Sequence, residues 1–140
     1  MKSRALLLAA ATSLALSGCA TMETAKSGAS CNENVCHIRL NITSCKPSGS
    51  AITAYPDEAH IGRGSHEIHW DIASTGYEFT ANGITFKKPA GSVFTSAQKL
   101  TGTKYKWHDN NTAPGRYDYN IEVMSASGSV CRCDPTIVND

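Results

Sequence analysis

Arg116-Tyr117-Asp118-Tyr119-Asn120-Ile121-Glu122-Val123 is the stretch that decides the fold. Its apolar side chains stand at every second position, and the positions between them are polar. Successive side chains of a strand point to opposite faces of a sheet, so this alternation predicts a strand with one buried and one solvent-facing side. The same alternation returns at residues 36–43 and 67–72, which indicates half-buried antiparallel strands.

Shorter strand candidates fill the intervals between these three segments. Turn residues such as Asn82-Gly83 and Pro114-Gly115 separate them, and no helical period is sustained after residue 18. About seven to nine short strands at this spacing favour a two-sheet Greek-key sandwich. We therefore expect one all-β domain at residues 31–140. The shorter candidates are Ala51–Ala54, Tyr77–Thr80, Ile84–Lys87, Val93–Thr95, Tyr105–His108 and Ser129–Cys133.

The N-terminal residues have the organisation of a secretory signal peptide. Lys2 and Arg4 precede the apolar run at residues 5–11, and the segment closes with Leu16-Ser17-Gly18-Cys19. The apolar stretch is too short to cross a hydrocarbon core of about 30 Å as a helix. Leu-Ser-Gly-Cys resembles the bacterial lipobox, in which small residues admit the peptidase and the cysteine thiol accepts a diacylglyceryl group.

Lipidation would anchor the protein to a membrane without spanning it. We predict a cleaved signal peptide at residues 1–18, a lipid on Cys19, and a flexible linker over the small and polar residues 19–30. Two or more acyl chains anchor stably, so the expected partner is the lipid bilayer. No Asp follows Cys19, which favours the outer membrane facing the periplasm. The alternative is an ordinary signal peptide whose cleavage site ends in cysteine.

Charge excludes one class of partner. Removing Lys2 and Arg4 takes Lys+Arg from 13 to 11, against 12 Asp+Glu, so the mature chain is close to neutral. The sequence has no basic stripe, and we expect no nucleic-acid partner.

Five cysteines follow Cys19, and an exported chain meets an oxidising compartment, so we expect disulfides. Cys131 and Cys133 face the same side of a strand and are poorly placed to bond each other. The preferred pairing joins Cys36 to one of them and Cys31 to the other, and leaves Cys45 unpaired. Two alternatives remain: the unpaired Cys45 thiol forms an intermolecular disulfide, or Cys131 and Cys133 form a redox or Cu(I) site.

Residues Pro114–Ile121 resemble the penultimate strand of a cupredoxin, where a Pro-Gly-x-Tyr-x-Tyr strand runs into the copper site. The resemblance extends to Ile68–Ile72, Tyr77–Phe86, Trp107–Asn111 and the closing Asp134–Asn139. Together these segments are similar to small bacterial sandwich domains of the DP-EP type. The resemblance implies a cupredoxin-like or immunoglobulin-like sandwich, and it implies no particular activity.

The chain departs from true cupredoxins at the metal ligands. A blue-copper site needs two histidines and a cysteine with a weak axial ligand, commonly methionine. Ile121 occupies the position of the copper cysteine, and no histidine follows it in the chain. We therefore expect no cofactor, and we interpret Met124 as a core or rim residue.

Histidines offer an alternative metal site. His66 and His69 are three residues apart and should face opposite sides of a strand. His37 and His69 both lie on predicted polar faces and would meet if their strands are neighbours. With Glu67 or Asp71 they would suit zinc or copper.

Acidic residues on the strands are expected to face solvent, Asp109 among them. Asp109-Asn110-Asn111 is expected to form a turn whose side chains bond backbone amides, with a ligand role as the alternative. The sequence has no Gly-x-Ser-x-Gly elbow, His-Glu-x-x-His or phosphate loop, so we expect no catalytic residue and no enzyme.

The predicted function is a non-enzymatic lipoprotein of the cell envelope. It would bind another envelope component, such as a protein, or support an assembly through a sheet face or edge strand. The alternative is a periplasmic protein that binds copper or another metal, either through Cys131 and Cys133 or through the surface histidines His37 and His69.

Overall fold

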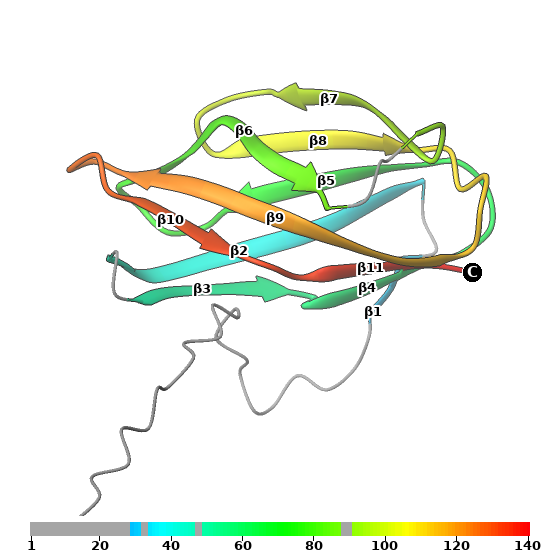
Figure 1. Cartoon of the computed structure of the whole chain (residues 1–140), viewed down its shortest axis with the longest axis horizontal. Helices are drawn as coiled ribbons and strands as arrows, with labels where there is room; N and C mark the ends of the chain where they lie inside the picture. The colour runs from blue at the N-terminus through cyan, green and yellow to red at the C-terminus, as the bar shows by residue number, and fades with distance from the viewer. Residues whose placement is uncertain (1–28, 32–33, 47–48, 88–90) are drawn as a thin grey trace, which may run out of the picture.

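The computed structural model describes residues 29–31, 34–46, 49–87 and 91–140. Every regular element in these ranges is a strand, and Figure 1 shows the strands arranged in two facing layers. The chain is therefore all-β, with two sheets of mixed orientation packed together, which confirms the predicted β-sandwich.

Eleven strands are described. In chain order they are β1 (Ala29–Cys31), β2 (Val35–Lys46), β3 (Gly49–Tyr55), β4 (Glu58–Ile61), β5 (His66–Ile72), β6 (Tyr77–Phe86), β7 (Phe94–Lys99), β8 (Lys104–Asp109), β9 (Gly115–Ser125), β10 (Val130–Cys133) and β11 (Thr136–Asn139).

One sheet has the order β1-β4-β11-β9-β10, with β6 paired to the other side of β9, and the second has the order β3-β2-β5-β8-β7. Three pairings are parallel: β1 with β4, β4 with β11, and β2 with β5. The expectation of antiparallel strands is wrong for these three. Parallel strands that pair with each other are distant in the chain. The alternation of apolar and polar residues within one strand does not indicate whether its neighbour runs parallel or antiparallel.

β6 continues without interruption through Asn82-Gly83, a pair of residues that predicted a turn. Its register with β9 shifts between Phe79 and Ile84, so the additional residues form a bulge within one strand. A Cβ on Gly83 would lie only 2.8 Å from the Cβ of Phe79, and this close approach is why glycine stands at the bulge.

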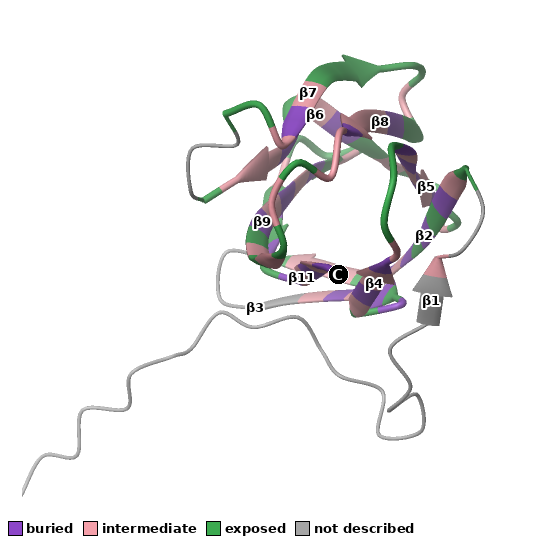
Figure 2. Ribbon diagram, turned by 90° about the vertical axis from the view of Figure 1, so that its right-hand side faces the viewer, coloured by how far each residue is buried: buried purple, intermediate pink, exposed green. Residues whose placement is uncertain are grey.

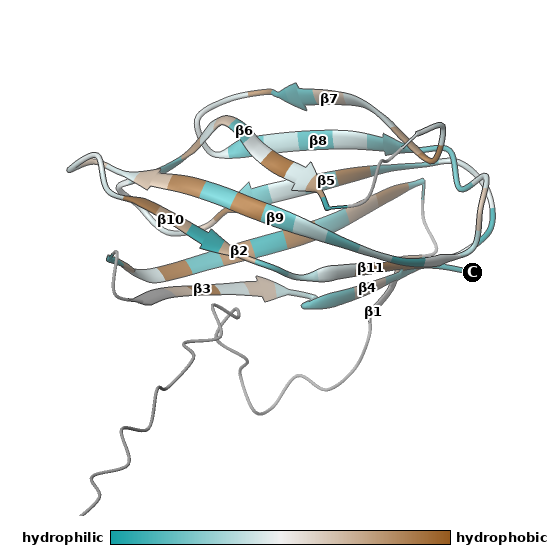
Figure 3. Cartoon of the chain, in the orientation of Figure 1, coloured by the Kyte–Doolittle hydropathy of each residue, from teal (hydrophilic) through white to brown (hydrophobic). Residues whose placement is uncertain are grey.

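The core lies between the sheets and follows the predicted alternation. Figure 2 shows buried positions alternating with exposed ones along the strands, and Figure 3 shows the matching alternation of hydropathy along β2 and β9. Trp70 and Tyr119 are fully buried as predicted, and their rings pack edge to face with centroids 5.4 Å apart. Trp107 and Tyr117 are partly buried against this core.

A hydrogen bond joins the two sheets at the centre of the core. Trp70 Nε1 on β5 donates to the Tyr119 hydroxyl on β9 at 3.1 Å. Burial raises the pKa of Tyr119 far above its usual value, so the hydroxyl stays protonated. Each polar atom of this buried pair is therefore satisfied.

Two disulfides correct the expected pairing. Cys31 bonds Cys36, with Cα atoms 5.1 Å apart, and Cys45 bonds Cys131, with Cα atoms 5.3 Å apart. The expectation that Cys45 is unpaired, and that Cys31 and Cys36 both reach the closing pair, is therefore wrong. β2 is long enough to carry Cys45 along the sandwich to β10, where β2 and β10 are in contact. No cysteine of the described ranges is free.

The domain begins slightly earlier than expected. β1 starts at Ala29, two residues inside the segment 19–30 that the sequence assigned to the linker, and it pairs with β4. The predicted signal peptide and Cys19 lie outside the described residues. The described ranges hold no helix with the length and hydropathy required to cross a membrane.

Candidate functional site

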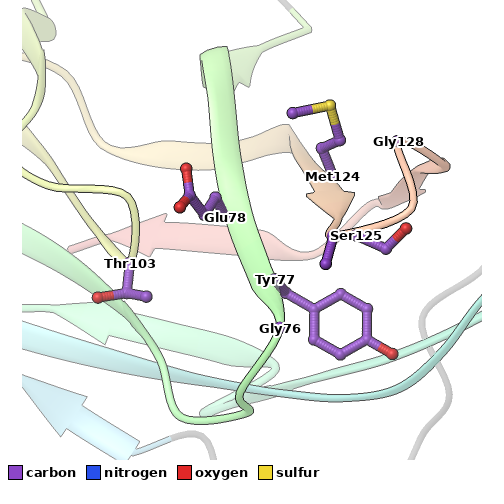
Figure 4. Close-up of a pocket in the computed structure, with 8 residues that line it drawn as sticks. Gly76, Tyr77, Glu78, Thr103, Met124, Ser125 and Gly128 are labelled. Atoms are coloured by element: carbon purple, nitrogen blue, oxygen red, sulfur yellow. The ribbon is translucent and has the colours of Figure 1, made fainter.

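A groove opens at the end of the sandwich where three turns meet, between β5 and β6, β7 and β8, and β9 and β10. It encloses about 420 Å³. Figure 4 shows Tyr77 and Glu78 on β6, with their side chains on opposite sides of the strand, and Met124 on β9. The groove is lined by Gly76, Tyr77, Glu78, Thr103, Met124, Ser125, Ala126 and Gly128.

Strand register sets the row of side chains beside the groove. Glu78 of β6 pairs with Met124 of β9, and Met124 pairs with Val130 of β10. Directly paired residues share one face of a sheet, so a carboxylate and two apolar side chains form a row across three strands. Met124 is 40% and Val130 42% exposed. Met124 was interpreted from the sequence as a core or a rim residue, and its exposure makes it a rim residue.

Backbone hydrogen bonds hold the three turns in place. Phe79 N donates to Gly102 O at 2.8 Å, and Ala126 N donates to Gly76 O at 2.9 Å. Gly76 and Gly128 have φ values of +81° and +85°, a conformation that glycine adopts without strain. The groove is thus built into the fold before any ligand arrives.

Glu78 gives the groove its chemical character. It is the one charged residue in the lining, its side chain is exposed, and it makes no hydrogen bond or ion pair within the described part of the chain. An ionised carboxylate only accepts hydrogen bonds, whereas the Met124 thioether in register with Glu78 offers polarisable surface, and the Tyr77 ring on the other face of β6 offers apolar surface (Figure 4). This arrangement suits a ligand with a cationic donor group attached to an apolar body.

A second polar cluster lies on the outward face of β2, β5 and β8. The register pairs His37 with His69, and their rings lie edge to face with centroids 5.5 Å apart. The prediction that these histidines meet is confirmed. His66 is buried on the opposite face of β5, as its spacing from His69 predicted.

Both histidines of this cluster are engaged by carboxylates. His69 Nε2 lies 2.8 Å from Glu67 Oε2, and His37 Nδ1 lies 3.5 Å from Asp71 Oδ2. The hydrogen bonds from His69 and then from Lys106 lower the pKa of Glu67 to about 2. The cluster is an ion-pair network of the kind that covers an exposed sheet face.

The two alternatives for a metal site lie in different sheets. Cys131 and Cys133 are buried on β10, in the sheet opposite to His37 and His69, and Cys131 is bonded to Cys45. Within the described ranges, no group of three or more histidine, cysteine, aspartate or glutamate side chains is arranged to hold a metal ion.

Asp109 corrects another expectation, because its side chain is fully buried rather than solvent-facing. The predicted turn is present: Asp109 Oδ1 accepts the backbone N–H of Asn111 at 2.8 Å. Tyr105, Trp107 and Asp109 occupy every second position of β8 and so share one face of the strand. Because Tyr105 and Trp107 point inward, the alternation along this strand already indicated that Asp109 would be buried.

Comparison with known proteins identified no similar protein. No protein-family model matches the chain, and no curated protein matches it. The function proposed below therefore depends on the sequence and on the geometry of the groove.

Proposed function

We propose that this protein is a lipid-anchored lipoprotein of the bacterial cell envelope, held at the outer membrane and facing the periplasm. In this proposal it is a non-enzymatic binding module whose binding site is the groove beside Glu78. The observation that carries the proposal is an exposed carboxylate without a partner in the described chain, set beside Met124 in a groove whose turns are fixed by backbone hydrogen bonds.

The occupant we propose is a segment of another envelope protein that presents a lysine side chain next to apolar residues. The lysine ammonium would donate to Glu78, and its methylene chain would lie on Met124, which shares the same face. A groove of about 420 Å³ has room for a few side chains, in the range typical of specific pockets. Exposed Val130 extends the apolar surface beyond the groove.

The position of β1 is compatible with binding by an anchored protein. The proposed tether precedes β1, and Figure 1 places β1 away from the turn between β9 and β10 that borders the groove. A partner could thus reach the groove without displacing β1.

The anchor is tested by Cys19→Ala. We expect the variant to lose labelled-palmitate incorporation and membrane retention, because the thiol that accepts the lipid is gone. Fractionation of cells that express the wild-type protein or the variant measures retention, and circular dichroism of the purified proteins checks that the β-fold is kept. Unchanged membrane fractionation of the variant would refute lipidation at Cys19.

The groove is tested by carbodiimide cross-linking in intact cells, which joins a carboxylate to a lysine amine in direct contact. We expect one cross-linked peptide to link Glu78 to a lysine of an envelope protein. Glu78→Gln should abolish that peptide and weaken binding to the purified partner about tenfold, since a charge-assisted hydrogen bond is lost.

The control is Asp140→Asn, which makes the same change of charge at an exposed residue following β11. It should leave the Glu78 cross-link unchanged. Cross-links spread equally over other carboxylates, with none enriched at Glu78, would contradict the groove as the binding site.

A further inference from the structure

Two buried oxygen atoms lie at the end of the sandwich remote from the groove. Asp109 Oδ2 and Asn139 Oδ1 have no hydrogen-bond partner among the described residues, and the two residues are 0% and 2% exposed. Buried polar atoms in folded proteins are nearly always partnered. The same two side chains already share one hydrogen bond, from Asn139 Nδ2 to Asp109 Oδ1 at 3.2 Å. Both unexplained atoms therefore belong to a single contact.

We infer that Asp109 is a neutral carboxylic acid in the folded protein and that its Oδ2–H donates to Asn139 Oδ1. A carboxylic acid and a carboxamide form two antiparallel hydrogen bonds, one N–H to O and one O–H to O. A single proton thus partners both oxygens. An ionised carboxylate would offer only acceptors to the amide oxygen and would leave both atoms buried without a donor.

The surroundings of Asp109 favour the neutral form. Burial raises the pKa of Asp109, against the opposing effects of hydrogen bonds from Asn111 and Asn139 and of the charges of His66 and His108. These two histidines are the charged groups that act on it. His66 Nδ1 lies 2.9 Å from Gly64 O, and His108 Nε2 lies 2.8 Å from Ser65 Oγ.

The other groups beside Asp109 carry no charge. β7 places the apolar Phe94 in register with it, and β11 contributes the uncharged Asn139. Asp140 follows Asn139 and is exposed. Apart from His66, which stands opposite Asp109 on β5, no neighbouring strand of the described ranges supplies a cation that would stabilise an ionised Asp109.

A bound cation is the competing explanation for two unpartnered oxygens. Calcium takes about six to eight oxygen ligands, whereas Asp109 Oδ1 is already occupied by two N–H donors. A proton needs one acceptor, which Asn139 Oδ1 provides. The observed contacts therefore fit a proton better than a metal ion.

The proton would hold the two sheets together at this end. Asn139 is the last residue of β11, which lies between β4 and β9 in one sheet, and Asp109 is the last residue of β8 in the other. The folded pKa of Asp109 lies above its unfolded value. The contribution to stability is therefore complete below the ordinary value of 3.8 and is lost as the pH rises through the folded pKa.

Asp109→Asn tests the inference because an amide N–H replaces the acid O–H in the same shape. Thermal unfolding of the full chain in detergent should give midpoints within about 3 °C of each other near pH 4. As the pH rises, the wild-type midpoint should fall progressively below that of the variant, because only the wild type has a carboxyl to ionise. A variant less stable than the wild type at every pH would overturn the inference.

A second measurement does not depend on the variant folding. The side-chain carboxyl ¹³C signal of Asp109 in the wild-type protein should stay at the neutral-acid position as the pH is raised through the ordinary aspartate value of 3.8. An Asp109 signal that moves to the carboxylate position at that ordinary value would contradict the inference. A calcium-dependent rise in the wild-type midpoint that is absent in Asp109→Asn would assign the site to a cation instead and would also overturn it.

Discussion

Replacing Cys45 and Cys131 together by alanine will lower the free energy of unfolding by about 4–5 kcal/mol, because their bond closes a loop with a sequence separation of 86. Cross-linking restricts the unfolded chain, and the restriction grows with the length of the closed loop. The double replacement also avoids leaving a lone thiol that could form intermolecular bridges. Urea unfolding without reductant measures the loss.

The second disulfide provides the matched control. Cys31 and Cys36 are separated by only five positions, so replacing both by alanine should cost about 2 kcal/mol. The ranking of the two double variants is the critical result. Equal losses, or a greater loss at Cys31 and Cys36, would show that loop closure is not the main stabilising effect of the Cys45–Cys131 bond.

Trp70→Ala will cost about 3–5 kcal/mol of unfolding free energy, because it removes the largest fully buried side chain from the middle of β5. The loss includes the edge-to-face contact with Tyr119 and the cavity that remains. Tyr119→Phe should cost about 1–3 kcal/mol, since it keeps the ring but leaves Trp70 Nε1 buried without an acceptor.

Denaturant unfolding followed by circular dichroism separates these contributions. Val130→Ala is the control, because Val130 is 42% exposed and its truncation should change stability by less than about 0.5 kcal/mol. A Tyr119→Phe variant as stable as the wild type would mean that the hydrogen bond between the sheets contributes no net stability.

The long strands could be predicted from the sequence because each covers a full face of the core. β2, β5 and β9 alternate apolar and polar residues over most of their lengths, and one face of each is buried. The short strands β1, β4 and β11 escaped prediction. They have three or four residues each, too few to establish a period, and their parallel pairing joins parts of the chain that are far apart.

The disulfides and the groove could not be predicted because they depend on tertiary geometry. Cys45 meets Cys131 only because β2 extends along the sandwich to β10. Glu78 and Met124 become a site only where three turns converge, and nothing in the local sequence of β6 or β9 indicates that convergence. By contrast, the contact between His37 and His69 could be predicted because both lie on the polar faces of their strands. Only the pairing of those two strands in one sheet was unknown.

β2 is bracketed by covalent bonds near its two ends, and this has a mechanical consequence. A pull on the chain ahead of Ala29 reaches β2 through Cys31–Cys36, so the segment between these cysteines cannot lengthen under tension. At the far end Cys45–Cys131 passes the load to β10 and so to the other sheet. β2 is thus held by a disulfide near each end, and a load that has passed β1 reaches the second sheet through two covalent bonds.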